Sequence, residues 1–295
     1  MNIYHLPGNG IFGGIKVGYQ FAGILDELGV PILVATPDGQ SPQWFSTNVA
    51  TISHKRALEL IVPGTNVIFS YPPDYPELLS TKSNLINHCQ GTDDRMNVIL
   101  SNHEVKILTC WRYAYNYTKK LTGRNAIEVG IHISDKFFYN GESKIKNQVA
   151  CMPRKGSRLI DVCEKDNPQL HFVRIDNYSE TKTAQILKKS DIFLATSVDE
   201  MFGLPALEAM AAGAVVVTVP VVGGMDYLRQ DKNCILSSPE DLAKSLNYIT
   251  DPRQHSFKEE IRLYGRLTAN NYMYSSQKRF IKTILDNEIS FFKDT

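Results

Sequence analysis

The chain has 295 residues, which at roughly 100–200 residues per domain favours two domains. Its composition, 43% hydrophobic and 21% charged, is that of a globular protein with a sizeable core. With 32 Lys and Arg against 31 Asp and Glu, the net charge of +1 argues against a dedicated nucleic-acid-binding protein, which usually carries a basic excess.

Several features bear on the compartment and on metal binding. The first residues lack the basic start and apolar core of a signal peptide, and no apolar run reaches the ~18 residues of a membrane-spanning helix. The five cysteines are scattered, which indicates reduced thiols, and the seven histidines show no metal-binding spacing. These features predict a cytoplasmic protein without a bound metal ion.

Short apolar runs alternate with amphipathic stretches along the chain, as is typical of α/β domains with parallel sheets. In the first half we expect strands at 2–6, 31–35 and 66–71, weaker strands at 85–88 and 105–110, and helices at 15–28, 54–60 and 111–122. In the second half we expect strands at 148–152, 171–175, 192–195, 214–219 and 234–236, and helices at 158–164, 181–188, 205–212, 239–248 and 257–274.

Two such series follow one another, separated by a loop-rich stretch at 128–141. This break predicts a first domain over residues 1–132 and a second domain over residues 133–275. In the remaining segment, 276–295, the apolar spacing at 277–292 predicts an amphipathic helix. Such a helix would pack back on a domain, for which the N-terminal domain is a candidate, or lie on a membrane surface, although acidic residues dilute its basic face.

A glycine-rich loop follows the first expected strand. Gly8, Gly10 and Gly13 form a G-x-G-x-x-G pattern, which lets a phosphate or sugar approach the backbone at a helix N-terminus. A dinucleotide site also requires an acidic residue at the end of the second strand, and the nearest one, Asp38, lies in a turn-like Pro-Asp-Gly sequence. The loop therefore favours a phosphate or sugar ligand over NAD(P), with a purely structural turn as the remaining alternative.

The strongest signal is the stretch 197–213, which follows an expected buried strand. Pro205 suits the first turn of a helix and Gly213 the residue after its end, so Glu200 lies in the preceding loop and Glu208 about one turn into the helix. The helix N-terminus would favour an anion, and the carboxylates would accept hydrogen bonds from sugar hydroxyls. On spacing alone, the alternative that the two glutamates only stabilise the start of the helix explains them equally well.

Glu200, seven residues and then Glu208 resemble the E-x7-E motif of retaining GT-B glycosyltransferases, especially glycosyltransferase family 4. The resemblance is dense over residues 148–250 and thin before them. Three further segments agree with the family in order: the glycine loop with Gly13 and Gly14, the G-G-x-Asp stretch at 223–226, and 231–236, where Cys234 replaces a usual glycine. The resemblance implies an α/β GT-B fold, in which two Rossmann-like domains face each other across a cleft.

In that family the first domain, which is short here, mainly faces the acceptor, and the second binds the nucleotide-sugar donor. By the resemblance, Glu208 would hold the ribose hydroxyls of the nucleotide and Glu200 hydroxyls of the transferred sugar. The other donor-binding residues that it implies are Gly13 and Gly14 over the diphosphate, Phe202, Gly203, Leu204 and Gly224 near the sugar and phosphates, and Asn177 and Tyr178 in the nucleobase loop.

The resemblance also implies positively charged residues beside the leaving diphosphate. The family usually supplies an Arg and a Lys several residues apart, whereas this chain has a compressed cluster of Arg154, Lys155 and Arg158. Lys155 matches the family's lysine better, either arginine would be its counterpart, and a solvated basic loop is the alternative. A histidine of the first domain often approaches the sugar in this family, and His88 is the first candidate for this catalytic position, with His103 second.

The implied reaction transfers a sugar from a nucleotide sugar to an acceptor hydroxyl with retention at the anomeric carbon, in glycan or cell-envelope polysaccharide synthesis, without a metal ion or other cofactor. The expected partners are the nucleotide sugar and a glycan or lipid-linked acceptor, but no nucleic acid. The aromatic and basic stretch 111–120 would bury its aromatic face, stack on sugars or touch a membrane, so we expect a cytoplasmic protein or one peripheral to the inner membrane face.

Three alternatives stay open at this point. The first is a nucleotide-sugar-binding protein that kept the fold but lost catalysis, which the short first half and the irregular basic cluster would suit. The second is an NAD(P)-dependent oxidoreductase that uses the G-x-G-x-x-G loop. The third is an epimerase of the same fold, since that scaffold also binds nucleotide sugars.

Overall fold

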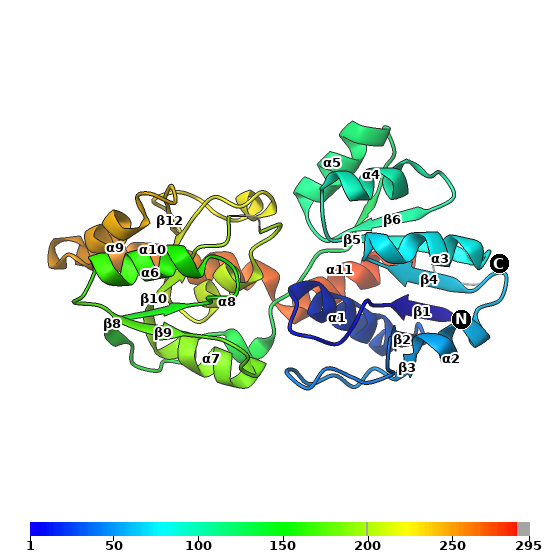
Figure 1. Ribbon diagram of the computed structural model, residues 1–295, viewed down its shortest axis with the longest axis horizontal. Coiled ribbons are helices and arrows are strands. Elements are labelled where there is room, and N and C mark those ends of the chain that lie inside the picture. Colours follow the sequence, from blue (N-terminus) through cyan, green and yellow to red (C-terminus); the bar gives the residue numbers. More distant parts are fainter. Residues whose placement is uncertain (199, 288–295) are drawn as a thin grey trace. The chain divides into compact units, whose positions relative to one another are not determined.

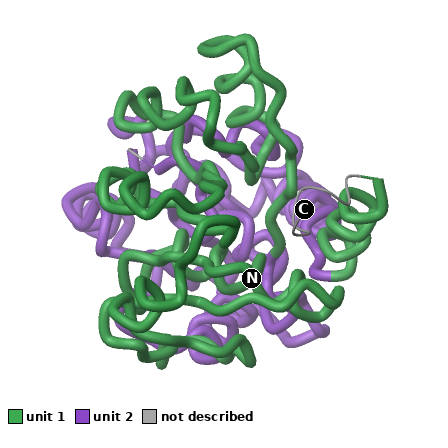
Figure 2. Tube along the Cα trace, turned by 90° about the vertical axis from the view of Figure 1, so that its right-hand side faces the viewer, with its two compact units in different colours: residues 1–132, 275–295 green, residues 133–274 purple. Residues whose placement is uncertain are grey.

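The computed structural model describes residues 1–198 and 200–287, and it contains two parallel α/β sheets (Figure 1). The chain divides into two compact units, which Figure 2 colours separately. Unit 1 comprises Met1–His132 and the segment that starts at Ser275, and unit 2 comprises Ile133–Tyr274. The last part of the helix expected at 277–292, from residue 288 on, lies outside the described residues.

Unit 1 is built on a seven-stranded sheet of order β3-β2-β1-β4-β5-β6-β7, in which every neighbouring pair is parallel. Its strands are β1 (Asn2–His5), β2 (Ile32–Thr36), β3 (Thr51–Ser53), β4 (Asn66–Phe69), β5 (Asn84–Cys89), β6 (Lys106–Thr109) and β7 (Ile127–Glu128). Its helices are α1 (Gly13–Glu27), α2 (His54–Leu60), α3 (Tyr75–Ser80), α4 (Asp94–Ser101), α5 (Arg112–Thr122) and α11 (Tyr274–Asn287).

Side chains alternate between the two faces of this sheet, and helices cover both of them. Val67 and Leu85 of the central strands form a core with Leu78 of α3 and Ile99 of α4. On the opposite face, Phe21 and its neighbours on α1 pack against strand residues such as His88, with ring centroids 4.7 Å apart. A parallel sheet covered in this way explains why its strands read as continuous apolar runs in the sequence.

Helix α11 returns to unit 1 after the chain has passed through unit 2. The side-chain amide of Gln277 donates to the carbonyl oxygens of Val129, at 3.1 Å, and Gly130, at 2.8 Å. The ammonium of Lys278 lies 2.6 Å from the carboxylate of Glu27 on α1, and Ile281 is buried. The last helix is therefore fixed to the unit that contains the N-terminus.

Unit 2 is built on a five-stranded sheet of order β12-β11-β10-β8-β9, again parallel throughout. Its strands are β8 (Ile145–Cys151), β9 (His171–Arg174), β10 (Ser190–Ala195), β11 (Val215–Thr218) and β12 (Ile235–Leu236). Its helices are α6 (Ser157–Asp166), α7 (Glu180–Lys189), α8 (Leu204–Ala211), α9 (Leu242–Thr250) and α10 (His255–Ala269).

The strand order of unit 2 creates a switch point between β8 and β10, which are neighbours although β9 lies between them in sequence. Helix α6, which follows β8, shares a core with α9 through Ile160 and Leu246. Helix α8, which follows β10, contacts α7 and α10 instead. Ligands of doubly wound sheets bind at the carboxyl ends of the strands beside such a point, so this edge is where a site is expected.

The structure also contains elements that periodicity did not reveal. The short elements β3, α3, α4 and β7 were not expected, because two to eight residues show too little periodicity to distinguish them from loops. The helix expected at 257–274 is confirmed as α10 up to Ala269, but its expected end is wrong, since a 3₁₀ turn, Asn270–Tyr272, separates α10 from α11. Among the residues that the structure describes, no helix is long and apolar enough to cross a membrane.

Candidate functional site

The loops that follow β8 and β10 are tied together at the switch point. The hydroxyl of Thr196 donates to the carbonyl oxygen of Lys155 at 3.3 Å, and the hydroxyl of Ser197 donates to the same oxygen at 3.2 Å. The backbone of Lys155 is thereby fixed beside the end of β10, while its side chain remains half exposed. Two segments far apart in the sequence meet here because their strands are neighbours in the sheet.

Gly156 makes this close contact between the loops possible. Its φ is +100°, in the left-handed region, and a Cβ at this position would lie 2.5 Å from the Thr196 hydroxyl and 2.6 Å from the Thr196 carbonyl oxygen. Any other residue would therefore push the two loops apart. Helix α6 begins at the next residue, so its N-terminus lies at the same edge of the sheet.

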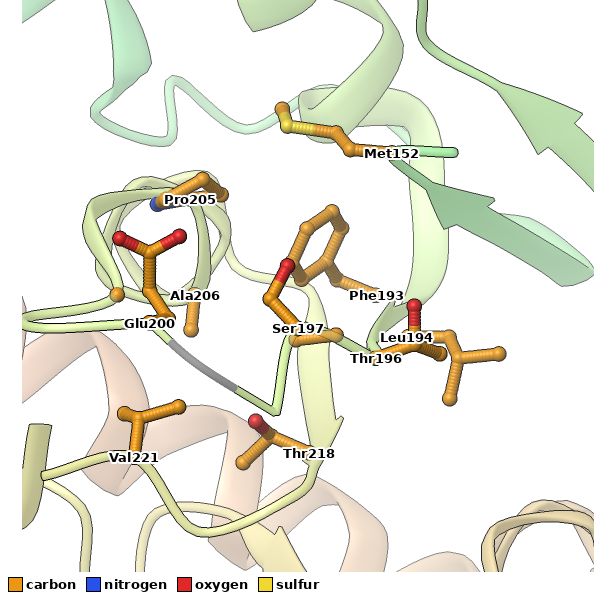
Figure 3. Close-up of a pocket in the computed structure, with 12 residues that line it drawn as sticks. Met152, Phe193, Leu194, Thr196, Ser197, Glu200, Pro205, Ala206, Thr218 and Val221 are labelled. Carbon is orange, nitrogen blue, oxygen red and sulfur yellow. The ribbon is translucent and has the colours of Figure 1, made fainter. Parts of the chain in front are cut away.

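A pocket opens at the ends of these strands and at the start of α8 (Figure 3). A carboxylate and several hydroxyl groups share it with apolar side chains, the mixture that is typical of small-molecule sites. The residues that line it are Met152, Phe193, Leu194, Ala195, Thr196, Ser197, Glu200, Gly203, Pro205, Ala206, Thr218 and Val221.

The entrance of α8 is a left-handed turn at Gly203, whose φ is +82°. The hydroxyl of Tyr227 donates a hydrogen bond of 2.7 Å to the Gly203 carbonyl oxygen. The Tyr227 ring is buried against Phe202 and Tyr272, with ring centroids 5.3 and 6.1 Å away. Burial raises the pKa of Tyr227 well above its usual range, so the hydroxyl stays protonated and remains a donor at any physiological pH.

Both glutamates of the E-x7-E stretch lie at this entrance. Glu200 lines the pocket, and its Oε2 accepts a hydrogen bond of 3.2 Å from the Nζ of Lys155. Glu208 lies four residues after the start of α8 and is 7% exposed. Both carboxylates lie close enough to Tyr227 to contribute to the rise in its pKa, after burial and its other neighbours. The structure thus brings Glu200, Lys155 and Gly203 together, with Glu208 one turn farther along the helix.

Other expected donor-binding residues surround this group in unit 2. Arg154 and Arg158 are exposed on either side of Gly156. A Cβ on Gly224 would collide with the side chain of Val221 and lie 3.0 Å from the carbonyl oxygen of Phe202, so this loop packs directly against the approach to α8.

The remaining expected donor-binding residues are not among the described residues that line the pocket. Asn177 and Tyr178 follow β9, the edge strand, and both are exposed; neither is among the described residues that line the pocket. Gly13 and Gly14 are the first two residues of α1 in unit 1, where the side-chain oxygen of Gln90 would lie 2.6 Å from a Cβ on Gly14.

The structure buries His88, the first candidate for the catalytic histidine, and gives both of its ring nitrogens a partner. The side chain is completely buried; its Nδ1 lies 2.8 Å from the Tyr4 hydroxyl and its Nε2 lies 3.0 Å from the Cys110 thiol. Burial lowers the pKa of His88 to about 3, so the ring is neutral. The second candidate, His103, is exposed but precedes β6, at the amino end of the strand and opposite the edge where ligands bind.

Asp38, the candidate acid for a dinucleotide site, closes a turn. Its carboxylate accepts hydrogen bonds from the Gln40 amide at 3.0 Å, the Asn9 side chain at 3.2 Å and the Thr36 hydroxyl at 3.3 Å. These bonds lower the pKa of Asp38 and occupy the groups that a ribose would need. Within residues 1–198 and 200–287, no three or more His, Cys, Asp or Glu side chains are grouped to hold a metal ion.

Met152, Thr218 and Tyr227 are among the residues of the site that sequence reasoning missed. Met152 follows the end of β8 and Thr218 is the last residue of β11, so the rule that ligands bind at strand carboxyl ends could have identified both. Tyr227 offered no comparable signal, because its role depends on a hydrogen bond to a residue 24 positions earlier.

The residues of this site lie largely within a segment that matches a known protein family. Residues 157–266, all within unit 2, match the family "Glycosyl transferases group 1". The uncharacterised glycosyltransferase MJ1607 of Methanocaldococcus jannaschii is 28% identical over 125 residues, which are 42% of this chain and 32% of that protein. The chain therefore covers about a third of the length of this curated relative.

Solved structures resemble the chain over almost its whole length. HepE of Anabaena, solved with UDP and glucose, has a TM-score of 0.71 at 11% identity and covers 97% of this chain, which covers 99% of it. Sucrose-phosphate synthase of Thermosynechococcus elongatus has a TM-score of 0.72 at 13% identity, with 98% and 99% covered. At such low identities the likeness shows the fold, and with the two parallel sheets it shows that the chain has two Rossmann-like units of the GT-B fold.

The Tyr227 hydroxyl provides a first test of this geometry. Tyr227→Phe keeps the ring but leaves the Gly203 carbonyl oxygen without this donor, so we expect the free energy of unfolding to fall by about 1 kcal/mol. Urea unfolding of both proteins measures the difference. Tyr248→Phe, at a half-exposed tyrosine of the same unit, is the control and should change little. Equal stability of wild type and Tyr227→Phe would contradict the role given to this bond.

His88 provides a second test, through pH. Its folded pKa lies below the unfolded value, so the unfolded chain takes up the proton, and stability present above about pH 6.5 is lost as the pH falls. Between pH 7 and pH 5 we expect His88→Gln to lose about 2 kcal/mol less stability than wild type. Denaturant unfolding at both pH values measures these losses, and identical losses would show that His88 is accessible to protons in the folded protein.

Proposed function

We propose that the protein transfers a sugar from a nucleotide-sugar donor to an acceptor hydroxyl, with retention of the anomeric configuration. The observation that carries this proposal is that Glu200 lines a pocket at the switch point of unit 2, just before α8 begins, with Glu208 one turn into that helix. The family match over the same residues supports it. HepE, which shares the fold, has been solved with UDP-glucose, and this supports a nucleotide sugar as the donor class.

Unit 2 has a suitable binding group for each part of such a donor. Glu208, one turn into α8, would accept hydrogen bonds from the ribose hydroxyls, and Glu200 at the pocket from hydroxyls of the sugar. The diphosphate would lie between the N-terminus of α8 and the ammonium of Lys155, where the helix dipole and a positive charge both favour an anion. Arg154 and Arg158 add positive potential next to Lys155.

The reaction needs the stabilisation of a leaving group more than it needs a protein nucleophile. As the bond between the anomeric carbon and the diphosphate breaks, negative charge grows on the phosphate oxygens. Lys155 and the N-terminus of α8 would stabilise that charge. The acceptor hydroxyl would attack from the same face and pass its proton to a phosphate oxygen, which gives retention. Glu200 would hold the sugar in position during this step.

We further propose a glycan or lipid-linked acceptor, in polysaccharide synthesis at the cytoplasmic side of a membrane. Helix α5 of unit 1 supports this proposal. Tyr113 is 38% and Leu121 is 41% exposed, next to the exposed cations Lys119 and Lys120. Aromatic and basic side chains on one short helix suit peripheral contact with a membrane surface.

Glu208 tests the proposal. Glu208→Gln keeps the size of the side chain but removes a charged hydrogen-bond acceptor, so nucleotide affinity should fall at least about tenfold and transfer should be nearly lost. Calorimetry with UDP, GDP and ADP measures binding, and proton NMR of the product of the matching nucleotide sugar reports the anomer. Glu240→Gln, at an exposed glutamate of the same unit, is the control. Wild-type affinity and transfer in Glu208→Gln, or an inverted product, would contradict the proposal.

The positive groups around Lys155 lead to a prediction about metal ions. Because lysine, arginine and a helix N-terminus can neutralise the diphosphate, we expect transfer to require no divalent cation. EDTA at about 5–10 mM removes Mg²⁺. Initial rates of transfer in this concentration of EDTA should stay within about twofold of the untreated rate. Loss of activity in EDTA that Mg²⁺ restores would show that a metal ion carries the charge instead.

A further inference from the structure

The two side chains that the proposed function uses on opposite parts of the donor are bound to each other in the structure. Lys155 follows β8 and Glu200 follows β10, and their charged atoms lie 3.2 Å apart across the switch point. Figure 3 shows the Glu200 carboxylate beside Pro205, the second residue of α8. In this arrangement the charge of Lys155 is partly compensated and Oε2 of Glu200 is engaged, so a donor competes with this ion pair for both groups.

We propose that this ion pair is the resting state of the donor site and that the diphosphate of the donor replaces Glu200 as the partner of Lys155. The released Glu200 carboxylate then accepts hydrogen bonds from the hydroxyls of the sugar. The inference rests on the proposed function, and it adds that Glu200 weakens the binding of a nucleoside diphosphate that carries no sugar. After transfer, Glu200 competes again for Lys155 and thereby favours release of the nucleoside diphosphate.

The exposure of the pair makes such an exchange feasible. The side chain of Lys155 is 49% and that of Glu200 26% exposed, and ion pairs of this kind are weak because water screens them. A diphosphate carries more negative charge than one carboxylate, and it would also meet the N-terminus of α8. It should therefore compete successfully for the ammonium group.

The local backbone restricts the exchange to side chains. Thr196 and Ser197 both donate to the Lys155 carbonyl oxygen, and Gly156 fixes the following turn, so the lysine backbone stays at the edge of the pocket. The long and flexible side chain of Lys155 can swing without moving that backbone. Glu200 remains close to the α8 entrance, with its Cγ 4.0 Å from the Cβ position of Gly203, so the helix dipole still favours its charge when the lysine leaves.

The proposal predicts effects of opposite sign for two ligands of one variant. In Glu200→Gln the lysine has no carboxylate partner, so the nucleoside diphosphate should bind about two- to fivefold tighter than in wild type. The matching nucleotide sugar should bind more weakly, because its hydroxyls lose a charged acceptor. Calorimetry with the full chain uses UDP, GDP and ADP, followed by the glucose ester of the nucleotide that binds wild type most tightly.

A double-variant cycle shows whether Lys155 is the cause. Lys155→Met should weaken the binding of the nucleoside diphosphate, and adding Glu200→Gln to it should give no further gain. Asp241→Asn is the matched control, because Asp241 forms an exposed ion pair of 2.7 Å with Lys244 in the same unit. It removes the same charge and should leave both affinities unchanged. Thermal unfolding of each variant checks that it is folded.

The outcomes separate this inference from the proposed function. If wild type binds no nucleoside diphosphate and no glucose ester, the proposed function fails and this inference fails with it. If wild type binds them but Glu200→Gln leaves the affinity for the diphosphate unchanged or lower, only the exchange is overturned. If the gain in affinity for the nucleoside diphosphate persists in the Lys155→Met background, or if Asp241→Asn reproduces it, the effect comes from general electrostatics. That result also overturns the exchange.

Discussion

The left-handed turn at Gly203 is the constraint on which the candidate site depends. It sets the direction in which α8 leaves the end of β10, and so it decides where the residues before and after it lie. The hydroxyl of Tyr227 donates a hydrogen bond to the Gly203 carbonyl oxygen, and it would lie 3.0 Å from a Cβ at Gly203. A larger residue at this position would therefore displace either the turn or this hydrogen bond. One buried tyrosine thus controls the geometry of an exposed site.

The strand order of unit 2 supplies the second half of the site. Because β8 and β10 are neighbours, Lys155 and Glu200 meet although they are 45 residues apart. Thr196 and Ser197 fix the backbone on one side, whereas the charged side chains stay partly exposed and only weakly paired. A rigid backbone with exchangeable charges is an arrangement that can bind and release an anionic ligand, and it requires no change in the fold.

The sequence predicts the elements that have strong local signals. The apolar runs predict the strands of both sheets except β3 and β7, and Pro205 and Gly213 delimit α8 to within one or two residues. Features that depend on tertiary contacts are not predictable in this way. His88 of β5 is buried beside Tyr4 of β1, two strands away in the sheet, and Cys110, which follows β6; the Lys155–Glu200 pair results from the strand order. The motif therefore predicts where the candidate site lies, but not the interactions that stabilise it.

The entrance of α8 in unit 2 is the proposed binding site of the nucleotide-sugar donor. The most direct measurement is a crystal structure of the protein with the nucleoside diphosphate that binds it most tightly. We predict density for the diphosphate at Gly203 and Lys155, with the ribose hydroxyls bound to Glu208. Density for the nucleotide at the glycine loop of unit 1, with the pocket of unit 2 empty, would contradict the claim.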